Sequence, residues 1–165
     1  RERAPMYNHL RFLFVTLLFC TVAWAAPAWR AFAPAGEKFT CQVPPGKIQE
    51  VKNPAAHQWI ILERGKYALQ VASIAQGGSA SQVNFYISKF LQSAKITETG
   101  RKDVKVNGLS GIEVVGSMAP GAKEKVGVRM RVFSTKDHIY HLAAFVPTSG
   151  NKQLVEPFFN SFKLK

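Results

Sequence analysis

The sequence predicts an α+β fold in which an antiparallel β-sheet is flanked by helices. Most of the chain consists of short segments with alternating polar and apolar residues, separated by turns that contain Gly, Pro or Asn. One segment, residues 81–96, has apolar residues at helical spacing instead. Residues 26–165, which follow a predicted signal peptide, have the length of a single domain with its own hydrophobic core.

Residues 1–25 are predicted to be a secretory signal peptide, whose three-part layout begins at Met6 and leaves residues 1–5 as an upstream piece. Basic residues precede an apolar run at 12–24, and the small residues Ala23 and Ala25 flank Trp24, which predicts cleavage after Ala25. The apolar run has 13 residues, whereas a membrane-spanning helix needs about 20. We therefore expect an exported protein, periplasmic or extracellular, with no stable transmembrane span after processing. Retention of the segment as a membrane anchor is the alternative.

The first strand is expected soon after the cleavage site. Residues 26–37 are rich in Ala and Pro and form an extended lead-in, so the domain itself is expected over 38–165. Residues 38–46 alternate in polarity and end in Pro44-Pro45-Gly46, which predicts a short strand that stops at the prolines.

Residues 57–75 are the clearest β-hairpin in the chain. Two alternating segments flank Arg64-Gly65, which suits a two-residue turn. This turn places Glu63 opposite Lys66, Leu62 opposite Tyr67 and Ile60 opposite Leu69.

An amphipathic helix is predicted after the Gly- and Ser-rich residues 76–82. Ser79 or Ser81 can cap its first turn. The glycine pair in this linker lacks the Lys-Ser/Thr that follows in a phosphate-binding loop. The apolar stripe that should cover a sheet consists of Val83, Tyr86, Ile87, Phe90, Leu91 and Ala94.

A meander of three or four strands is predicted after the helix. It takes in residues 102–119, with a turn at Asn107-Gly108, and then 125–133 and 138–146. The closing segment, 151–165, is apolar but contains Pro157. Proline interrupts a helix, so we expect a kinked helix or a helix followed by a short terminal strand.

His138 and His141 raise the question of a metal site. Residues three apart on a strand point to opposite faces, so this pair cannot ligate one ion together. A zinc site also needs three or four protein ligands, and no Cys or acidic residue lies at ligand spacing nearby. No metal, cofactor or catalytic residue is predicted.

A candidate partner-binding face emerges from the hairpin at 125–146. A loop at Thr135-Lys136, or one at 134–137, pairs Phe133 with His138, Arg131 with Tyr140 and Arg129 with Leu142. His141 then belongs to the core side, and a cation–π contact between Arg131 and Tyr140 is expected. Ordinary packing of arginine stems on a half-covered sheet is the alternative. The candidate face consists of Arg129, Arg131, Phe133, His138 and Tyr140.

Composition sets limits on the partner and on the chemistry. Residues 1–25 hold three of the 22 basic and one of the 10 acidic residues, which leaves a net charge of +10 on the remainder. Such a charge favours anionic partners. Cys41 is the one cysteine after residue 25, so no internal disulfide forms there. We expect it to be a buried small hydrophobe, although pairing with a partner's cysteine is an alternative.

Three functions are compatible with these observations. The first is a non-enzymatic exported domain that binds a protein or envelope component. The second is a general polyanion-binding protein that takes nucleic acid, acidic polysaccharide or anionic lipid. The third is a small hydrolase of unknown substrate that uses Cys41 or the histidines.

Several short strings resemble the exported bacterial domains of PsbP-like fold, a fold shared with the PsbP subunit of photosystem II and a Ran-binding import factor. They are "FTCQVPPG", "VNGLSGIEV", "RMRVFSTKDHIYHLAAF" and "PFFNSFKLK". The resemblance covers about residues 38–165 and implies an antiparallel sheet between helices, an α/β/α sandwich, without catalytic residues. The matching positions are Gly108, Gly111, Glu113, Arg129, Arg131, Phe133, Tyr140, Leu142, Phe158, Ser161, Phe162 and Leu164.

Overall fold

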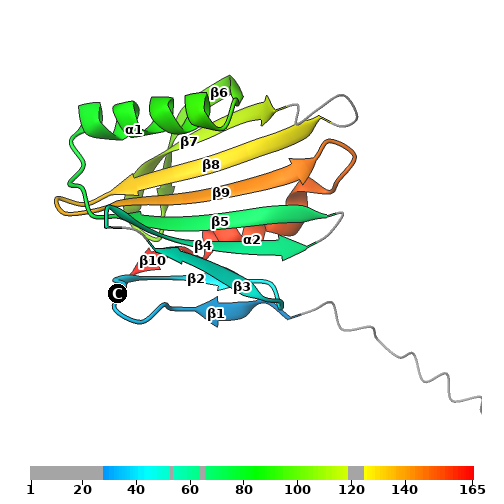
Figure 1. The fold of residues 1–165 in the computed structure, drawn as a ribbon, viewed down its shortest axis with the longest axis horizontal. Helices are drawn as coiled ribbons and strands as arrows, with labels where there is room; N and C mark the ends of the chain where they lie inside the picture. Colours follow the sequence, from blue (N-terminus) through cyan, green and yellow to red (C-terminus); the bar gives the residue numbers. More distant parts are fainter. Residues whose placement is uncertain (1–27, 53, 64–65, 119–124) are drawn as a thin grey trace, which may run out of the picture.

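The computed structural model describes residues 28–52, 54–63, 66–118 and 125–165. The predicted signal peptide lies outside the described residues. Within them the chain forms two antiparallel sheets, two α-helices and one 3₁₀ helix (Figure 1). The α+β prediction is confirmed.

The larger sheet has seven strands in the order β3-β4-β5-β9-β8-β7-β6. Their bounds are β3 Ile48–Lys52, β4 Ala56–Glu63, β5 Tyr67–Ile74, β6 Thr97–Val106, β7 Leu109–Met118, β8 Val126–Ser134 and β9 Ile139–Pro147. The predicted meander is therefore four strands long, β6 to β9, and it joins the first hairpin through the antiparallel pairing of β5 with β9.

Helices and a small second sheet cover the two faces of this sheet. Helix α1 (Ala80–Ser93) lies along one face (Figure 1). The other face carries the 3₁₀ helix η1 (Lys152–Val155), helix α2 (Glu156–Asn160) and a sheet of order β1-β2-β10. Its strands are β1 (Arg30–Phe32), β2 (Phe39–Val43) and β10 (Lys163–Leu164). This second layer mixes helix and strand, so a simple α/β/α sandwich describes only part of the architecture.

Alternation along the strands gives the large sheet two separate cores. Ile87 of α1 packs with Met130 and Ala143 on one face. On the other face Phe39, Phe158 and other aromatic residues pack with Leu142 and their neighbours. Because side chains on a strand alternate between faces, β9 contributes to both cores and is buried along most of its length.

The signals for the helix and for one turn are confirmed residue by residue. Ser79 caps α1, since its hydroxyl accepts from the Gln82 backbone N–H while the Gln82 side chain accepts from the Ser79 N–H. Asn107 and Gly108 have positive φ values of 49° and 83° between the paired residues Val106 and Leu109. This is the backbone of a tight hairpin turn, and it suits Asn-Gly.

Both predicted hairpin registers are wrong, by different amounts. Glu63 pairs with Tyr67, so the first hairpin is shifted by one residue; Leu62 faces Ala68, and Ile60 faces Gln70. In the second, Phe133 pairs with Tyr140, Arg131 with Leu142 and Arg129 with Ala144, a shift of two. The cause there is the turn. The Thr135 hydroxyl accepts from the backbone N–H of His138, and Thr135 N–H donates to the His138 carbonyl, which keeps His138 out of the strand.

The C-terminal segment takes the second of its two predicted forms. Pro157 lies in the first turn of α2. Backbone N–H groups in this turn have no acceptor within the helix, so the N–H that proline lacks is not needed and Pro157 does not kink the helix. The short strand β10 follows and pairs with β2. Two further strands were not expected: β1 lies within the predicted lead-in, and β3 is an exposed edge strand without alternation.

Candidate functional site

The predicted partner-binding face is covered by other parts of the chain. Phe133 and Tyr140 are 0% and 2% exposed, and Arg131 is 7% exposed. The ring of Phe162 stacks on Phe133 with 5.0 Å between centroids, and Phe39 contacts Tyr140 edge-on. The expectation of an open face is therefore wrong for these three residues. Of the five residues of the predicted face, Arg129 and His138 keep access to solvent, and each of them lines a different hollow.

The two arginines share one buried carboxylate. Nε of Arg129 and Nε of Arg131 both donate to Oε2 of Glu113, at 2.9 and 2.7 Å. Lys102 Nζ lies 3.2 Å from Oε1 of the same group. Burial by itself would raise the pKa of Glu113, but the hydrogen bonds from Arg131 and Arg129 outweigh it and hold the pKa below its usual value. Glu113 is therefore ionised at neutral pH.

The C-terminal segment fixes the positions of both guanidinium groups. Arg131 Nη1 donates to the Phe159 carbonyl at 3.2 Å and to Asn160 Oδ1 at 3.1 Å, and Arg129 Nη1 contacts the Glu156 carboxylate. Both guanidinium groups also lie over the Phe159 ring, 4.7 and 5.2 Å from its centroid. The predicted cation–π partner, Tyr140, is thus replaced by Phe159, which is distant in the sequence.

The first hollow is a groove of about 530 Å³, which we call the Arg129 groove. It opens where η1 and α2 meet the exposed part of the sheet face formed by β6 to β9. Apolar side chains, among them Val115, Ala144, Val146 and Val155, contribute to its lining. Lys102, Arg129 and Lys152 bring positive charge to it, and Glu113 and Glu156 bring negative charge. Concave apolar surfaces with a few convergent charges are typical of ligand sites.

Two of these cations retain unused donors. Within the described residues, Lys152 forms no ion pair, and Nη2 of Arg129 makes no hydrogen bond although Nε and Nη1 are engaged. Counting Arg131 behind the groove, four cations face two carboxylates. The surplus of positive charge suits an anionic group.

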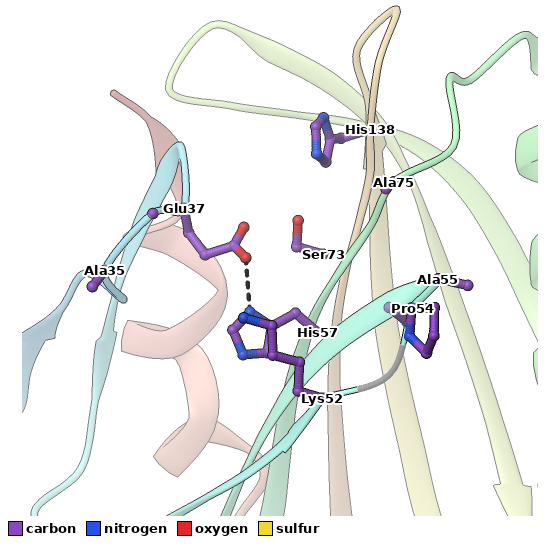
Figure 2. A pocket seen from close by; sticks show the side chains of 11 residues that line it. Ala35, Glu37, Lys52, Pro54, Ala55, His57, Ser73, Ala75 and His138 are labelled. Atoms are coloured by element: carbon purple, nitrogen blue, oxygen red, sulfur yellow. Dashed lines mark hydrogen bonds and ion pairs between the residues drawn. The ribbon is translucent and has the colours of Figure 1, made fainter.

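The second hollow, the His57 pocket, is smaller, at about 250 Å³ (Figure 2). The ring of His57 joins two carboxylates from different elements: Nδ1 lies 3.0 Å from Glu37 Oε1, and Nε2 contacts Glu50. Ser73 and His138 line the same pocket, and Figure 2 shows the Ser73 hydroxyl between the two histidines. Serine, histidine and glutamate are the groups of a hydrolytic triad.

His57 does not have the geometry of the base in such a triad. Both ring nitrogens of His57 contact carboxylates, so neither is directed at Ser73 as a base. The cluster instead connects the β1–β2 turn with β3 and β4. The three side chains therefore link the small sheet to the edge of the large sheet.

Replacing Glu37 with Gln should lower the free energy of unfolding by about 1 kcal/mol, because it weakens the contact with His57, which is better buried than the contact between Glu50 and His57. Glu50→Gln is the matched control and should cost less, since the Glu50 side chain is 56% exposed and that of Glu37 only 14%. Urea denaturation of both variants measures the difference. A larger loss for Glu50→Gln would contradict this role for Glu37.

Cys41 and His141, the residues considered for a hydrolase, lie on opposite faces of the large sheet. Cys41 is buried in the core beneath β2, and burial raises the pKa of its thiol to about 12, which disfavours the nucleophilic thiolate. His141 is fully buried beneath α1, between Tyr86 and Phe90, and burial lowers its pKa to about 3. The structure does not bring these two residues together.

The described residues contain no group of three or more His, Cys, Asp or Glu that could hold a metal ion. Among the same residues, no helix is long and apolar enough to cross a membrane.

Comparison with known proteins places the fold. The sequence matches no protein-family model and no curated protein. The solution structure of cyanobacterial PsbP (CyanoP) from Synechocystis sp. PCC 6803 is similar, with a TM-score of 0.63 at 11% sequence identity, over 87% of this chain and 96% of that one. The fold is PsbP-like. A crystal structure from Bacteroides thetaiotaomicron VPI-5482 has a TM-score of 0.54 at 12% identity over 82% of this chain, which spans about half (48%) of that protein.

The motif residues that suggested a PsbP-like fold have structural roles here. A Cβ on Gly111 would lie 2.5 Å from the Phe133 ring, so glycine is needed where these strands approach. Glu113 anchors both arginines. Ser161 accepts from the Gln42 backbone N–H at 2.7 Å and donates to the Phe158 carbonyl. The sequence patterns therefore indicated the PsbP-like core. Of the residues that line the two hollows, they indicated Glu113, Arg129 and His138.

Proposed function

We propose that this chain is an exported, non-enzymatic binding domain that takes an anionic group of a protein or envelope component in the Arg129 groove. The observation that carries the proposal is the surplus of positive charge there, with unused donors on Arg129 and Lys152. Export, to the periplasm or the exterior, rests on the signal-peptide layout of residues 1–25. The PsbP-like fold is consistent with such a role but does not assign it.

The groove favours one anionic group over a continuous anionic chain. Glu113 and Glu156 lie among the cations and would repel further negative charges along the same wall. A general polyanion binder would instead use lysines distributed over the surface. The net charge of +10 outside residues 1–25 favours that second function, so the two must be separated by experiment.

Charge reversal at the groove should separate them. Lys102→Glu combined with Lys152→Glu should weaken binding of a peptide that carries a single glutamate and a neutral fluorophore by about tenfold or more, a difference of about 1.4 kcal/mol. The matched control, Lys105→Glu with Lys163→Glu, changes the net charge equally at exposed lysines that do not line the groove. Fluorescence anisotropy measures both affinities. Equal weakening by the two double variants, with a steep salt dependence, would support the polyanion function and contradict the groove.

A further inference from the structure

We infer that the ligand of the Arg129 groove is a compact amphipathic acid, with an apolar body and a single carboxylate or similar anionic group at one end. The inference rests on the proposed function and specifies the ligand class. Three observations support it: the apolar lining of the groove, the open space beside Gly127, and the positions of the unused donors of Arg129 and Lys152.

Gly127 leaves open space on the groove side of β8. It belongs to the same strand face as Arg129 and Arg131, two and four residues further along. A Cβ built there would meet nothing closer than the Val146 carbonyl at 3.5 Å and Lys152 Cε at 3.8 Å. Its φ is not in the left-handed range, so the backbone does not require glycine. The missing side chain therefore leaves room for a ligand beneath the Lys152 stem.

The surfaces around Gly127 are apolar. Val115 lies on β7 opposite Arg129, and Ala144 lies on the other side of Arg129 on β9. Val115 is 38% exposed although it points to the side of the sheet that elsewhere forms a core. Val155 of η1 also lines the groove. Ala144 and Val155 are already buried, so the apolar area that a ligand body would remove from water is chiefly that of Val115.

The preorganised guanidinium group of Arg129 would bind the anionic end of the ligand. Arg129 is held by Glu113 and Glu156 and lies over the Phe159 ring, so its free Nη2 needs no reorganisation to donate. Lys152 supplies a second charge from η1 across the groove. Two donors and a volume of about 530 Å³ suit a carboxylate on a body the size of one or two rings or a medium acyl chain.

Decanoate and decanol provide the direct test, because they share an acyl chain and differ in charge. We expect decanoate to bind the protein saturably and to displace the fluorescent amphipathic acid 8-anilinonaphthalene-1-sulfonate. Gly127→Val, which fills the groove, should weaken decanoate binding at least tenfold. Ser88→Val adds the same side chain to the exposed side of α1 and should have no effect. Retained binding in a folded Gly127→Val variant would overturn the inference.

A second variant keeps the test independent of folding effects at Gly127. Lys152→Met retains the aliphatic stem but removes the charge, so it should weaken decanoate binding about tenfold and decanol binding less than twofold. If decanoate does not bind while binding of the single-glutamate peptide still depends on Lys102 and Lys152, the ligand class is wrong and the proposed function stands. If groove variants change binding of neither probe, both are wrong.

Discussion

Glu113→Gln is expected to lower the free energy of unfolding by about 3–5 kcal/mol, the usual cost of removing one partner from a buried ion-pair network. The Glu113 side chain is 4% exposed and accepts from both Arg129 and Arg131. Its neutral amide would leave Arg131, which is itself buried, without a counter-charge. The loss should appear as a lower denaturation midpoint in urea with an unchanged slope.

Glu98→Gln is the matched control for this prediction. Glu98 also forms an ion pair with an arginine, since its Oε2 lies 2.8 Å from Nη2 of Arg101, but both side chains are about one-third exposed. An exposed pair of this kind contributes about 0–1 kcal/mol. Equal losses for the two variants would show that burial of the Glu113 network does not stabilise the fold in the way described.

The second large effect is destabilisation by acid through His141. This side chain is fully buried, and Nδ1 lies 2.7 Å from the Tyr86 hydroxyl, with which it shares a hydrogen bond. Nε2 has no hydrogen-bond partner among the described residues, and the Phe90 ring lies edge-on at 4.3 Å between centroids. Burial away from water disfavours the imidazolium ion and lowers the pKa of His141 from 6.5 to about 3.

The direction of the pH effect follows from which state binds the proton. Below pH 6.5 the unfolded chain protonates His141 while the folded protein does not, so stability is lost as the pH falls towards about 3. At pH 4.5 the loss should be about 2–3 kcal/mol relative to neutral pH. Urea denaturation at a series of pH values between 7 and 4.5 measures it.

The double variant His141→Leu with Tyr86→Phe isolates this contribution. It removes the titrating ring together with the hydroxyl that would otherwise lose its hydrogen-bond partner. Carboxylates such as Glu113 still titrate in both proteins, so the difference between the two pH curves reports His141 alone. A double variant that lost as much stability as the original protein between pH 6.5 and 4.5 would refute the assignment.

Features encoded by neighbouring residues could be predicted from the sequence. The apolar stripe and the Ser79 cap of α1 lie within one short segment, as does the Asn107-Gly108 turn. The alternation at 125–146 assigned Arg131 and His141 to opposite faces correctly. The loop hydrogen bonds of Thr135, which decide the register, had no such signal, and a shift of two residues preserved the faces while changing every pair.

Features that depend on distant segments could not be predicted. The face that carries Arg131 and Tyr140 is closed by Phe39, far before it in the chain, and by Phe162 after it. Basic and aromatic residues on a strand have the same pattern whether a partner or another part of the chain covers them. The Arg129 groove likewise depends on where η1 stops short of covering Gly127 and Val115.

The central claim is that the Arg129 groove, and not the surface charge as a whole, binds the anionic group. Titrating ¹⁵N-labelled protein with decanoate and following the backbone amides and the Arg129 Nε–H tests it most directly. We expect saturable shifts at Gly127, Arg129, Ala144 and Lys152, with one dissociation constant. Shifts spread over exposed lysines such as Lys105 and Lys163, or confined to the His57 pocket, would contradict the claim.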